Sequence, residues 1–378
     1  MVKICFLSLN AYPILANTKV HEFAGGAEVE YICLGRELVN LGHDVCFVTY
    51  KERGYEVPEI EKIGGIEIIK SYPKYRANTL NILRKVRYIL KALRKANSDI
   101  YFGYGSSGIL ALHSLLYNKK FVFRISSDII ARRGSYFSSN TRLLCYYLMS
   151  LANRVELKKA AIVVAQTERQ KKLLAKKGIK SIVIRNGFVI KPSFSFKNEK
   201  THPPIVLWVG TLSYVKQPQL FLKLAKLLSK AQFEMIGPKA EGELQLFKYV
   251  EEESKKIPNI NYRGFVHPSE IDIFYKKASV LVNTSIYEGF PMSFIQAWLN
   301  YTPTISLNVD PDGIIEREGV GFYSKTFDRL VHDVHLLITD EKLREEMGWR
   351  ARKYAEREFD IRFIARKYAN IFEKIIKS

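Results

Sequence analysis

The chain has 378 residues, of which 47% are apolar and 26% are charged. This length suits two domains of about 100–200 residues each, and the composition supplies enough apolar material for packed cores. A small disulfide-stapled module and an intrinsically disordered protein are therefore excluded. Lysine and arginine outnumber aspartate and glutamate by 59 to 38, a net charge of +21. We expect an anionic partner, which charge alone leaves open among nucleic acid, lipid headgroups and phosphorylated small molecules.

The positive charge is concentrated in the first half of the chain. Residues 1–190 contain 31 basic and 14 acidic side chains, whereas residues 191–378 contain 28 and 24. The segment 70–95 has nine basic residues and no acidic one, and Ile82, Val86, Ile89 and Leu93 recur in it at helical spacing. A basic amphipathic helix is predicted over 80–95. It is either a domain helix with a solvated cationic face or a surface that docks on anionic lipid.

The first half alternates short apolar runs with longer helical periods. A strand is predicted over 3–9, a helix over about 27–41 and a second strand over 44–50. This order is typical of parallel strands joined by crossover helices. Further strands are predicted near 100–102, 121–125, 161–165 and 182–184. We therefore place a first domain over 1–190, and the segment 188–204, rich in proline and serine, is predicted to be a linker.

The second half repeats the same pattern. Strands are predicted over 204–210, 233–236, 280–283 and 304–307, with a helix over about 217–228 after the first of them. These elements predict a second α/β domain over 191–359. Residues 340–378 have helical periodicity, and the end of this stretch has an apolar stripe that includes Ile361, Ile364, Tyr368 and Phe372. We expect this C-terminal helix, about 360–378, to pack back on the first domain.

The sequence has no run of the ~18–20 apolar residues that a membrane span requires, and its first residues resemble a strand rather than a signal peptide. A cytoplasmic protein is expected, at most peripheral on the inner membrane face. Cys5, Cys33, Cys46 and Cys145 have no metal-ligand spacing and are expected to be reduced thiols. The histidines and carboxylates form no metal-binding pattern either, so neither a metal nor a cofactor is predicted.

Two glycine-containing segments follow predicted strands. Ligands bind beyond the carboxyl ends of parallel strands, so with two sheets the expected site is a cleft between them. Gly25-Gly26-Ala27-Glu28 opens the first long helix, where glycines let backbone N–H groups approach a phosphate. In the second domain, a loop that starts at Gly210 ends at Lys216, just before a helix. A cation at that position can neutralise a diphosphate leaving group.

The most specific segment runs from Asn283 to Trp298. A strand ends at Asn283, the following loop contains Glu288, Gly289 and Phe290, and Pro291 is predicted to be the first residue of a helix. The backbone donors of Gly289 and Phe290 would then face the cleft beside a carboxylate. Gln296 lies further along the same helix. An exposed Glu-Gly-Phe-Pro segment with apolar flanks indicates a binding loop rather than a simple turn.

These segments together resemble the retaining glycosyltransferases of the GT-B fold, specifically glycosyltransferase family 4. Five motifs stand in the family's order over nearly the whole chain: Gly25-Gly26-Ala27-Glu28, Asn186-Gly187, Val209-Gly210 with Lys216, Arg263-Gly264-Phe265 and the segment that starts at Glu288. The resemblance implies two Rossmann-like domains that face each other across a cleft, with a nucleotide-diphospho-sugar bound mainly by the second.

The same resemblance assigns roles to individual residues. It implies that Lys216 contacts the donor diphosphate, that Glu288 touches the donor sugar and that the loop at Val266 binds the base. Glu288 corresponds to the first acidic residue of the family's Glu-x7-Glu motif. The other implied donor contacts and the acceptor-side candidates complete the set: Gly26, Gly210, Thr211, Gly289, Phe290 and Gln296 for the donor, and Glu28, Ser127 and Asp128 for the acceptor.

The sequence also departs from the family pattern. Gln296 stands where the family has the second glutamate of its motif, which binds the ribose, and an amide hydrogen-bonds without charge. Thr211 stands where many members have arginine, which leaves Lys216 as the one evident cation on the diphosphate. Residues 124–128 occupy the loop where many members have a histidine near the reaction centre. The donor preference is therefore left open, and the expected acceptor is a glycan or a lipid-linked glycan.

Two other functions remain as alternatives. Gly103-x-Gly105-x-x-Gly108 follows a predicted strand, and Asp128 lies 20 residues further on, which formally matches a dinucleotide-binding signature of an NAD-dependent oxidoreductase. His113, on the helix after these glycines, is interpreted as a core or surface residue rather than a base. A basic nucleic-acid-binding protein is the second alternative. The arginines and lysines are not interleaved with aromatic residues on which bases could stack, so no specific nucleic acid is expected.

Overall fold

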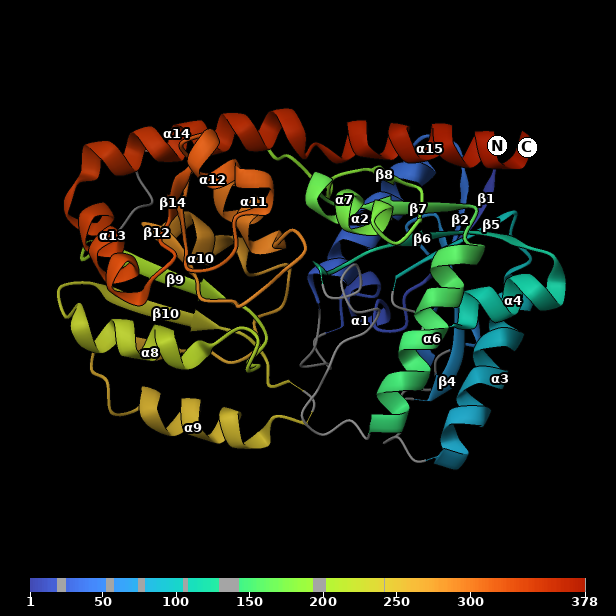
Figure 1. Cartoon of the computed structure of the whole chain (residues 1–378), viewed down its shortest axis with the longest axis horizontal. Helices are drawn as coiled ribbons and strands as arrows, with labels where there is room; N and C mark the ends of the chain where they lie inside the picture. Colours follow the sequence, from blue (N-terminus) through green and yellow to red (C-terminus); the bar gives the residue numbers. More distant parts are fainter. Residues whose placement is uncertain are drawn as a thin grey trace. The chain divides into compact units, whose positions relative to one another are not determined.

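A computed structural model (Figure 1) describes residues 1–18, 25–51, 58–73, 79–104, 108–128, 143–192, 202–240 and 242–377. Two compact units make up the chain. Unit 1 comprises Met1–Val189 together with Ile361–Ser378, and unit 2 comprises Ile190–Asp360. Each unit is built on its own mainly parallel sheet, as the alternating strand and helix patterns predict.

Unit 1 contains an eight-stranded sheet in the order β3-β4-β2-β1-β5-β6-β7-β8. Its strands, in that order, are β3 (Ile60–Ile63), β4 (Ile66–Pro73), β2 (Asp44–Lys51), β1 (Lys3–Leu7), β5 (Ile100–Gly103), β6 (Lys120–Arg124), β7 (Ile162–Ala165) and β8 (Ser181–Val183). All neighbouring strands are parallel except the hairpin of β3 and β4. The sequence patterns did not predict this hairpin. Its signal is Gly64-Gly65, because both glycines have the positive φ that a two-residue hairpin turn requires.

The helices of unit 1 cover both faces of this sheet. They are α1 (Tyr12–Leu15), α2 (Gly26–Asn40), α3 (Thr79–Ala96), α4 (Ile109–Tyr117), α6 (Leu143–Lys159), α7 (Glu168–Ala175) and α15 (Ile361–Lys377). The last of these helices lies beside α2 and returns the chain to unit 1, as expected from its apolar stripe (Figure 1). Tyr368 and Phe372 are fully buried, and the Tyr368 ring lies edge-on to Phe102 with centroids 5.3 Å apart.

A buried ionic network joins α2 and β6 to Asn186 and Gly187, which lie near the end of the first stretch of sequence in unit 1. The Arg124 guanidinium pairs with the Glu30 carboxylate, and each side chain is only 2% exposed. Arg124 also donates to Asn186 Oδ1 at 2.6 Å, while the backbone N–H of Gly187 donates to Glu30 at 3.3 Å. A Cβ on Gly187 would lie 2.4 Å from Ile361 Cδ1 and 3.2 Å from Ile364 Cβ, so a side chain at position 187 would require the first turn of α15 to shift. This network explains why an Asn-Gly pair stands at this point of the sequence.

Unit 2 contains a six-stranded sheet in the order β11-β10-β9-β12-β13-β14, and all of its neighbouring strands are parallel. The strands, in that order, are β11 (Ile260–Tyr262), β10 (Gln232–Ile236), β9 (Ile205–Val209), β12 (Val280–Asn283), β13 (Thr304–Ser306) and β14 (Gly321–Tyr323). The helices are α8 (Pro218–Leu227), α9 (Leu244–Ser254), α10 (Asp272–Lys277), α11 (Met292–Leu299), α12 (Ile314–Arg317), α13 (Phe327–Thr339) and α14 (Glu341–Glu358), with a 3-10 turn at Pro311–Gly313. Residues 193–201 of the expected linker lie outside the described residues.

The helical stretch predicted over 340–378 consists of two helices, and the second, α15, corresponds to the C-terminal helix expected over about 360–378. The first, α14, ends at Glu358, and Phe359 is fully buried against Trp298 and Tyr354 in unit 2. The second begins at Ile361, whose backbone N–H donates to the Phe188 carbonyl at 3.1 Å. The break therefore lies where the chain leaves one unit for the other, and helical periodicity alone does not reveal it.

His113 on α4 belongs to the core of unit 1, which is one of the two environments, core or surface, expected for it. Its side chain is buried, and its ring lies 4.4 Å from the Tyr101 ring. Cys5 and Cys46 are likewise buried free thiols on neighbouring strands, and Cys33 is half-buried. The Cys145 side chain lies outside the described residues.

The buried His113 predicts a loss of stability in acid. Burial lowers the pKa of His113 to about 4, and the charge of Lys119 acts in the same direction. The unfolded chain therefore binds a proton at His113 near pH 6.5, whereas the folded chain binds it only near pH 4. As the pH is lowered from about 6.5 to 4, the free energy of unfolding falls by about 1–3 kcal/mol. Urea titrations across this range should show a smaller loss for His113→Leu than for the unmodified chain. Equal pH dependence of the two would contradict the assignment.

Candidate functional site

The side chains of Lys216 and Glu288 form an ion pair in unit 2. Lys216 ends the loop after β9, and Glu288 lies in the loop between β12 and α11, so the two loops leave neighbouring parallel strands at the same edge of the sheet. Ser285 Oγ donates to the same Glu288 oxygen at 2.8 Å. The Lys216 side chain is 27% exposed and that of Glu288 is 13% exposed. Both charges are thus held at the strand ends while part of each remains accessible.

The backbone of Lys216 is fixed by a second, buried set of hydrogen bonds. Thr284 Oγ1 donates to the Lys216 carbonyl at 2.6 Å and accepts from the Trp208 indole N–H at 3.0 Å. Next to this pair, the Ile286 N–H donates to the Val215 carbonyl at 2.8 Å. Trp208 and Thr284 are buried. These contacts bind the two loops to each other, so the position of Lys216 relative to Glu288 is set by the sheet beneath.

Small residues open the space beside the Lys216 side chain. A Cβ placed on Gly210 would lie 3.7 Å from Lys216 Cδ and 3.3 Å from the Trp208 ring. Gly210 itself is approached by Gly237, at the end of β10, where a Cβ would lie only 1.7 Å from the Gly210 carbonyl oxygen. Glycine is therefore obligatory at position 237. Thr211, the next residue of the loop, is half-buried.

The loop that contains Val266 is anchored on β10. Arg263 donates two hydrogen bonds to Glu234, at 2.7 and 2.9 Å, and Gly264 has a left-handed φ of 66°. The Gly264 carbonyl accepts from the Gly237 N–H at 2.8 Å. Val266 is half-buried, so part of it faces solvent at this edge of the sheet. The Arg-Gly-Phe motif thus holds a loop in place through the pairing of its arginine with Glu234.

Helix α11 follows the Glu288 loop. Gly289 and Phe290 are buried, and Phe290 packs against Trp298 and Phe359. Pro291 was predicted to be the first helical residue, but it is the N-cap with extended backbone, and the helix begins at Met292. The difference is one residue, because the proline carbonyl already accepts the first helical hydrogen bond, from Phe294 at 3.1 Å.

Gln296 lies on α11 and its amide is oriented by Tyr275. The buried Tyr275 hydroxyl donates to Gln296 Oε1 at 3.3 Å. Burial raises the pKa of this phenol, so it stays protonated as a donor. With its carbonyl oxygen engaged, the half-buried Gln296 has its NH2 group left to donate to a ligand. A glutamate at this position would offer oxygens only.

This arrangement predicts a binding defect for an apolar residue at 296. We expect Gln296→Leu to weaken donor binding by ~1–3 kcal/mol, because it leaves ligand hydroxyls unpaired. Gln296→Glu should bind as well or more tightly, because one carboxylate oxygen can accept from Tyr275 and the other from a ribose hydroxyl. Isothermal titration with the cognate nucleotide measures both variants. Normal affinity of the Leu variant would show that this helix position does not face the ribose. Tyr275→Phe serves as the control that removes only the orienting hydrogen bond.

The glycine segment of unit 1 begins α2, with Gly25 as N-cap and Gly26 as the first helical residue. Glu28, in the first turn, is 4% exposed and accepts a hydrogen bond of 2.6 Å from the Tyr104 hydroxyl. Its carboxylate curls back over the helix start, since a Cβ on Gly25 would lie 2.3 Å from Glu28 Oε2. The acidic group expected on the acceptor side is thus positioned by an aromatic hydroxyl from the loop after β5.

Ser127 and Asp128 follow β6 and are both buried. Asp128 pairs with Arg169 at 3.3 Å and accepts from the Gln170 amide, also at 3.3 Å, and both partners lie on α7. Arg124 of the same segment is occupied by the buried network with Glu30. The loop is therefore fastened at both ends within unit 1.

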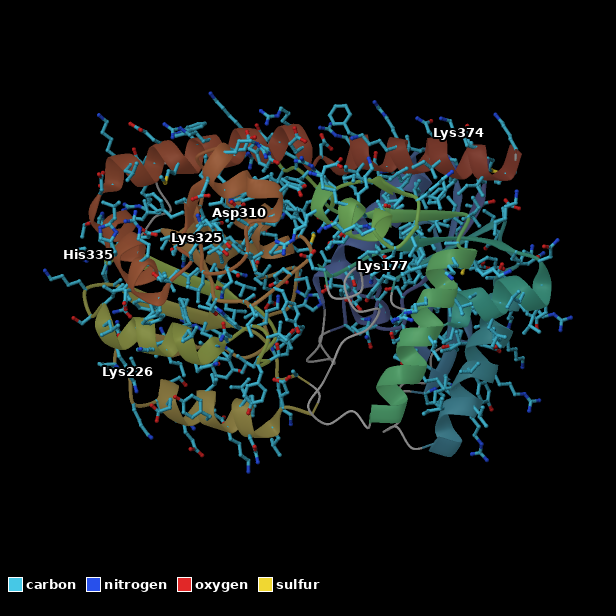
Figure 2. All side chains as sticks on the ribbon, viewed as in Figure 1. Lys177, Lys226, Asp310, Lys325, His335 and Lys374 are labelled. Atoms are coloured by element: carbon cyan, nitrogen blue, oxygen red, sulfur yellow. The ribbon has the colours of Figure 1, made fainter. Side chains whose placement is uncertain are left out.

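Several residues of the site in unit 2 were not predicted as functional. The sequence drew attention to Glu288 and not to Thr284 and Ser285, which precede it. Tyr275 lies on another helix, so its contact with Gln296 is not evident from the sequence. Asp310, labelled in Figure 2, accepts at its Oδ1 from the Ile315 N–H at 2.9 Å, and burial raises the pKa of its carboxyl. The available signal for Thr284 and Ser285 was their place as short polar residues directly after β12.

Two features are absent from the part of the chain that the structure describes. No group of three or more histidine, cysteine, aspartate and glutamate side chains in it is arranged to hold a metal ion. Among its helices, none combines the length and apolar character needed to span a bilayer.

Comparison with known proteins places both units. The model of Glycosyltransferase Family 4 matches residues 24–191, and the model of Glycosyl transferases group 1 matches residues 190–354. An uncharacterized glycosyltransferase of Methanocaldococcus jannaschii, MJ1607, is 22% identical over 92% of this chain and 94% of its own length. The amylovoran biosynthesis glycosyltransferase AmsD of Erwinia amylovora is 27% identical over 64% of this chain and 69% of its own.

Solved structures of the GT-B fold match the whole chain. Sucrose-phosphate synthase from Thermosynechococcus elongatus superposes with a TM-score of 0.82 at 17% identity and covers 100% of both chains. HepE of Anabaena, solved in complex with UDP and glucose, gives a TM-score of 0.71 at 16% identity over 99% of this chain and 100% of its own. The two family models together span residues 24–354, and the chain belongs to the group 1 glycosyltransferases of family 4, with the GT-B fold.

Proposed function

We propose that this glycosyltransferase moves a hexose from a nucleotide-diphospho-sugar to an acceptor hydroxyl with retention of the anomeric configuration. The observation that carries the proposal is the pair of Lys216 and Glu288 at the strand ends of unit 2. Retention is inherited from the family resemblance. In this proposal, Lys216 meets the diphosphate, Glu288 contacts the sugar, and Gly210, Thr211, Gly289 and Phe290 shape the space around them.

The charges of the pair support these roles. A departing diphosphate gains negative charge in the transition state, and a cation held at that position stabilises it without reorganisation. Thr284 and Ser285 fix the two partners through hydrogen bonds of 2.6 and 2.8 Å, so the geometry exists before the donor binds. In this proposal, the base lies on the loop at Val266, and the NH2 group of Gln296 donates a hydrogen bond to a ribose hydroxyl.

The proposed acceptor is a glycan or a lipid-linked glycan in polysaccharide synthesis. The support is the excess of basic side chains in residues 1–190, which suits an acceptor presented at an anionic membrane surface. We place the enzyme on the cytoplasmic side, as a peripheral protein of the inner membrane face that docks through 80–95. Glu28, Ser127 and Asp128 of unit 1 are the proposed acceptor contacts, with Gly26 toward the donor. The proposed reaction uses no metal or cofactor.

A thermal-shift screen of UDP-, GDP-, ADP- and dTDP-sugars tests the donor class. A ligand present at 100 times its dissociation constant adds ~2.7 kcal/mol to the free energy of unfolding, which raises the melting temperature measurably. The nucleotide found in this way is then compared with its bare nucleoside. Lys216→Ala should lower the maximal rate and weaken the diphosphate but leave the nucleoside unaffected. Lys325→Ala, which removes an exposed lysine paired with Glu316, is the matched control.

The outcomes separate catalysis from structure. Equal losses of nucleoside and nucleotide sugar in Lys216→Ala would assign Lys216 a structural role, and absence of any shift in the screen would contradict the donor class. Anomeric configuration is read from the NMR spectrum of the first product formed. An inverted product would overturn the retaining assignment without affecting the donor site.

The oxidoreductase alternative receives no support from the described residues. Gly103 lies inside β5 and Gly108 is the N-cap of α4, whereas Gly105 lies outside the described residues. Asp128, the acidic residue of that signature, pairs with Arg169. Family membership instead accounts for both halves of the chain.

A further inference from the structure

Three neighbouring helices of unit 1 expose apolar side chains together with cations. Helix α4 lies beside both α3 and α6 (Figure 1). On α4, Leu112, Leu115 and Leu116 are 38%, 61% and 56% exposed. Their spacing of three and four residues puts them on one side of the helix, opposite the buried Leu110. An exposed stripe of three leucines on one short helix is a contact surface rather than scattered exposure.

The neighbouring helix α3 adds both kinds of side chain. Ile89 and Leu93 are buried, as predicted, but Ile82 is 47% exposed, and Leu83 and Tyr88 are exposed as well. Six cations lie between and around them: Arg84, Lys85, Arg87, Lys91, Arg94 and Lys95. The Arg94 guanidinium lies 5.7 Å from the ring of Tyr117, at the end of α4, so the basic helix and the leucine stripe are connected.

These three helices expose no acidic side chain in the part of the chain that the structure describes. Neither α3 nor α4 contains one, and the single glutamate of α6, Glu156, is fully buried. Helix α6 exposes Leu151 and Val155 and ends in Lys158 and Lys159. Among the described residues, Glu59 pairs with Lys95 at 3.3 Å. The surface therefore combines positive charge with protruding apolar side chains.

We propose that the exposed residues of α3, α4 and α6 form a bilayer-insertion face, in which the α4 leucines enter the headgroup and acyl boundary of an anionic membrane while the α3 cations contact its phosphates. The positive charge and the exposed apolar side chains of this face together determine which partner fits it. A second copy of this chain would bring like charges together, and nucleic acid offers no apolar region to receive three leucines. An anionic lipid surface satisfies both kinds of side chain at once.

Insertion is a stronger statement than electrostatic docking. Purely electrostatic binding disappears at 1 M salt, where the Debye length is about 3 Å. A leucine contact with the acyl boundary survives salt, because apolar burial is not screened. The inference rests on the proposed lipid-linked acceptor only for its biological use, since binding to vesicles needs neither donor nor acceptor.

The experiment is co-sedimentation of the full chain with vesicles of phosphatidylcholine, with and without phosphatidylglycerol. We expect binding to the anionic vesicles that the triple variant Leu112→Ser, Leu115→Ser, Leu116→Ser weakens at least ~10-fold. The quadruple variant Arg84→Gln, Lys85→Gln, Arg87→Gln, Lys91→Gln should bind more weakly at about 0.1 M salt, and the unmodified chain should keep part of its binding at 1 M salt. Matched controls in unit 2 replace the exposed leucine Leu227 by serine, and four exposed lysines by glutamine: Lys223, Lys230, Lys248 and Lys255.

Insertion is then measured directly. Leu115→Trp should lose its added fluorescence when the vesicles contain lipids brominated on their acyl chains, whereas Leu227→Trp should not. Absence of vesicle binding, unchanged binding of the serine triple variant, or no quenching at position 115 would each overturn the proposal. Retention on single-stranded RNA instead of vesicles would assign the face to nucleic acid. Nucleotide-sugar thermal shifts, measured without vesicles, show whether the catalytic proposal stands or fails separately.

Discussion

Glu288→Gln should reduce sugar transfer by at least ~100-fold while the chain stays folded and binds the nucleotide nearly normally. The amide has the size of the carboxylate and can still accept from Ser285, so the loop should keep its shape. It lacks the negative charge that pairs with Lys216 and that, in the proposed reaction, contacts the sugar as positive charge develops at its anomeric carbon. Initial rates with saturating donor and acceptor measure the effect.

The control for this result is Glu316→Gln. Glu316 also pairs with a lysine of unit 2, Lys325, but both side chains are more than half exposed and their atoms are 3.6 Å apart. An exposed pair contributes little, so this variant should transfer sugar at the unmodified rate. Full activity of Glu288→Gln would remove Glu288 from the site, whereas equal losses in both variants would indicate a general effect of charge.

Arg124→Leu should lower the free energy of unfolding of unit 1 by about 3–5 kcal/mol, because it leaves the Glu30 carboxylate charged and unpaired in the interior. Burial already raises the pKa of Glu30, and the Arg124 guanidinium counteracts that rise. Without the guanidinium, the cost of charge at Glu30 is no longer offset. Urea unfolding followed by circular dichroism measures the change.

A second substitution distinguishes a broken pair from a general packing defect. The double variant Arg124→Leu, Glu30→Leu removes both charges and should recover much of the lost stability, as buried pairs replaced by apolar side chains often do. The control is Glu59→Gln, which breaks the exposed pair with Lys95 and should change stability by less than ~1 kcal/mol. A double variant as unstable as the single one would show that Asn186 and the loop depend on the charges themselves.

The strands at the sheet centres and the loops that follow them were predictable from sequence. Lys3–Leu7 and Val280–Asn283 are buried throughout or nearly so, and such parallel strands appear as continuous apolar runs. The family resemblance implied that Lys216 and Glu288 both contact the donor, and the structure brings the two side chains together as an ion pair. The strands are recognised from local apolar runs, and the two site residues from short motifs that stand in the family's order.

The elements that were missed depend on contacts between distant residues. Strand β3 is a short edge strand whose residues are only half-buried, so its pattern is weak. The orientation of Gln296 by Tyr275 joins positions 21 residues apart on two helices, and the contact of Arg124 with Glu30 joins positions 94 residues apart. No local period reports such contacts. The one-residue shift at Pro291 reflects the ordinary imprecision of helix ends.

The division of unit 1 into two stretches of sequence governs the order in which the protein can fold during synthesis. Unit 2 is continuous from Ile190 to Asp360, so it can complete its core as it leaves the ribosome. Unit 1 cannot, because Tyr368 and Phe372 of its core are made last. At translation rates of about 5–20 residues per second, roughly 13–55 s separate the synthesis of Phe102 from the synthesis of α15. A chaperone that binds apolar surface should therefore capture nascent chains paused before residue 361 and release them once α15 has emerged.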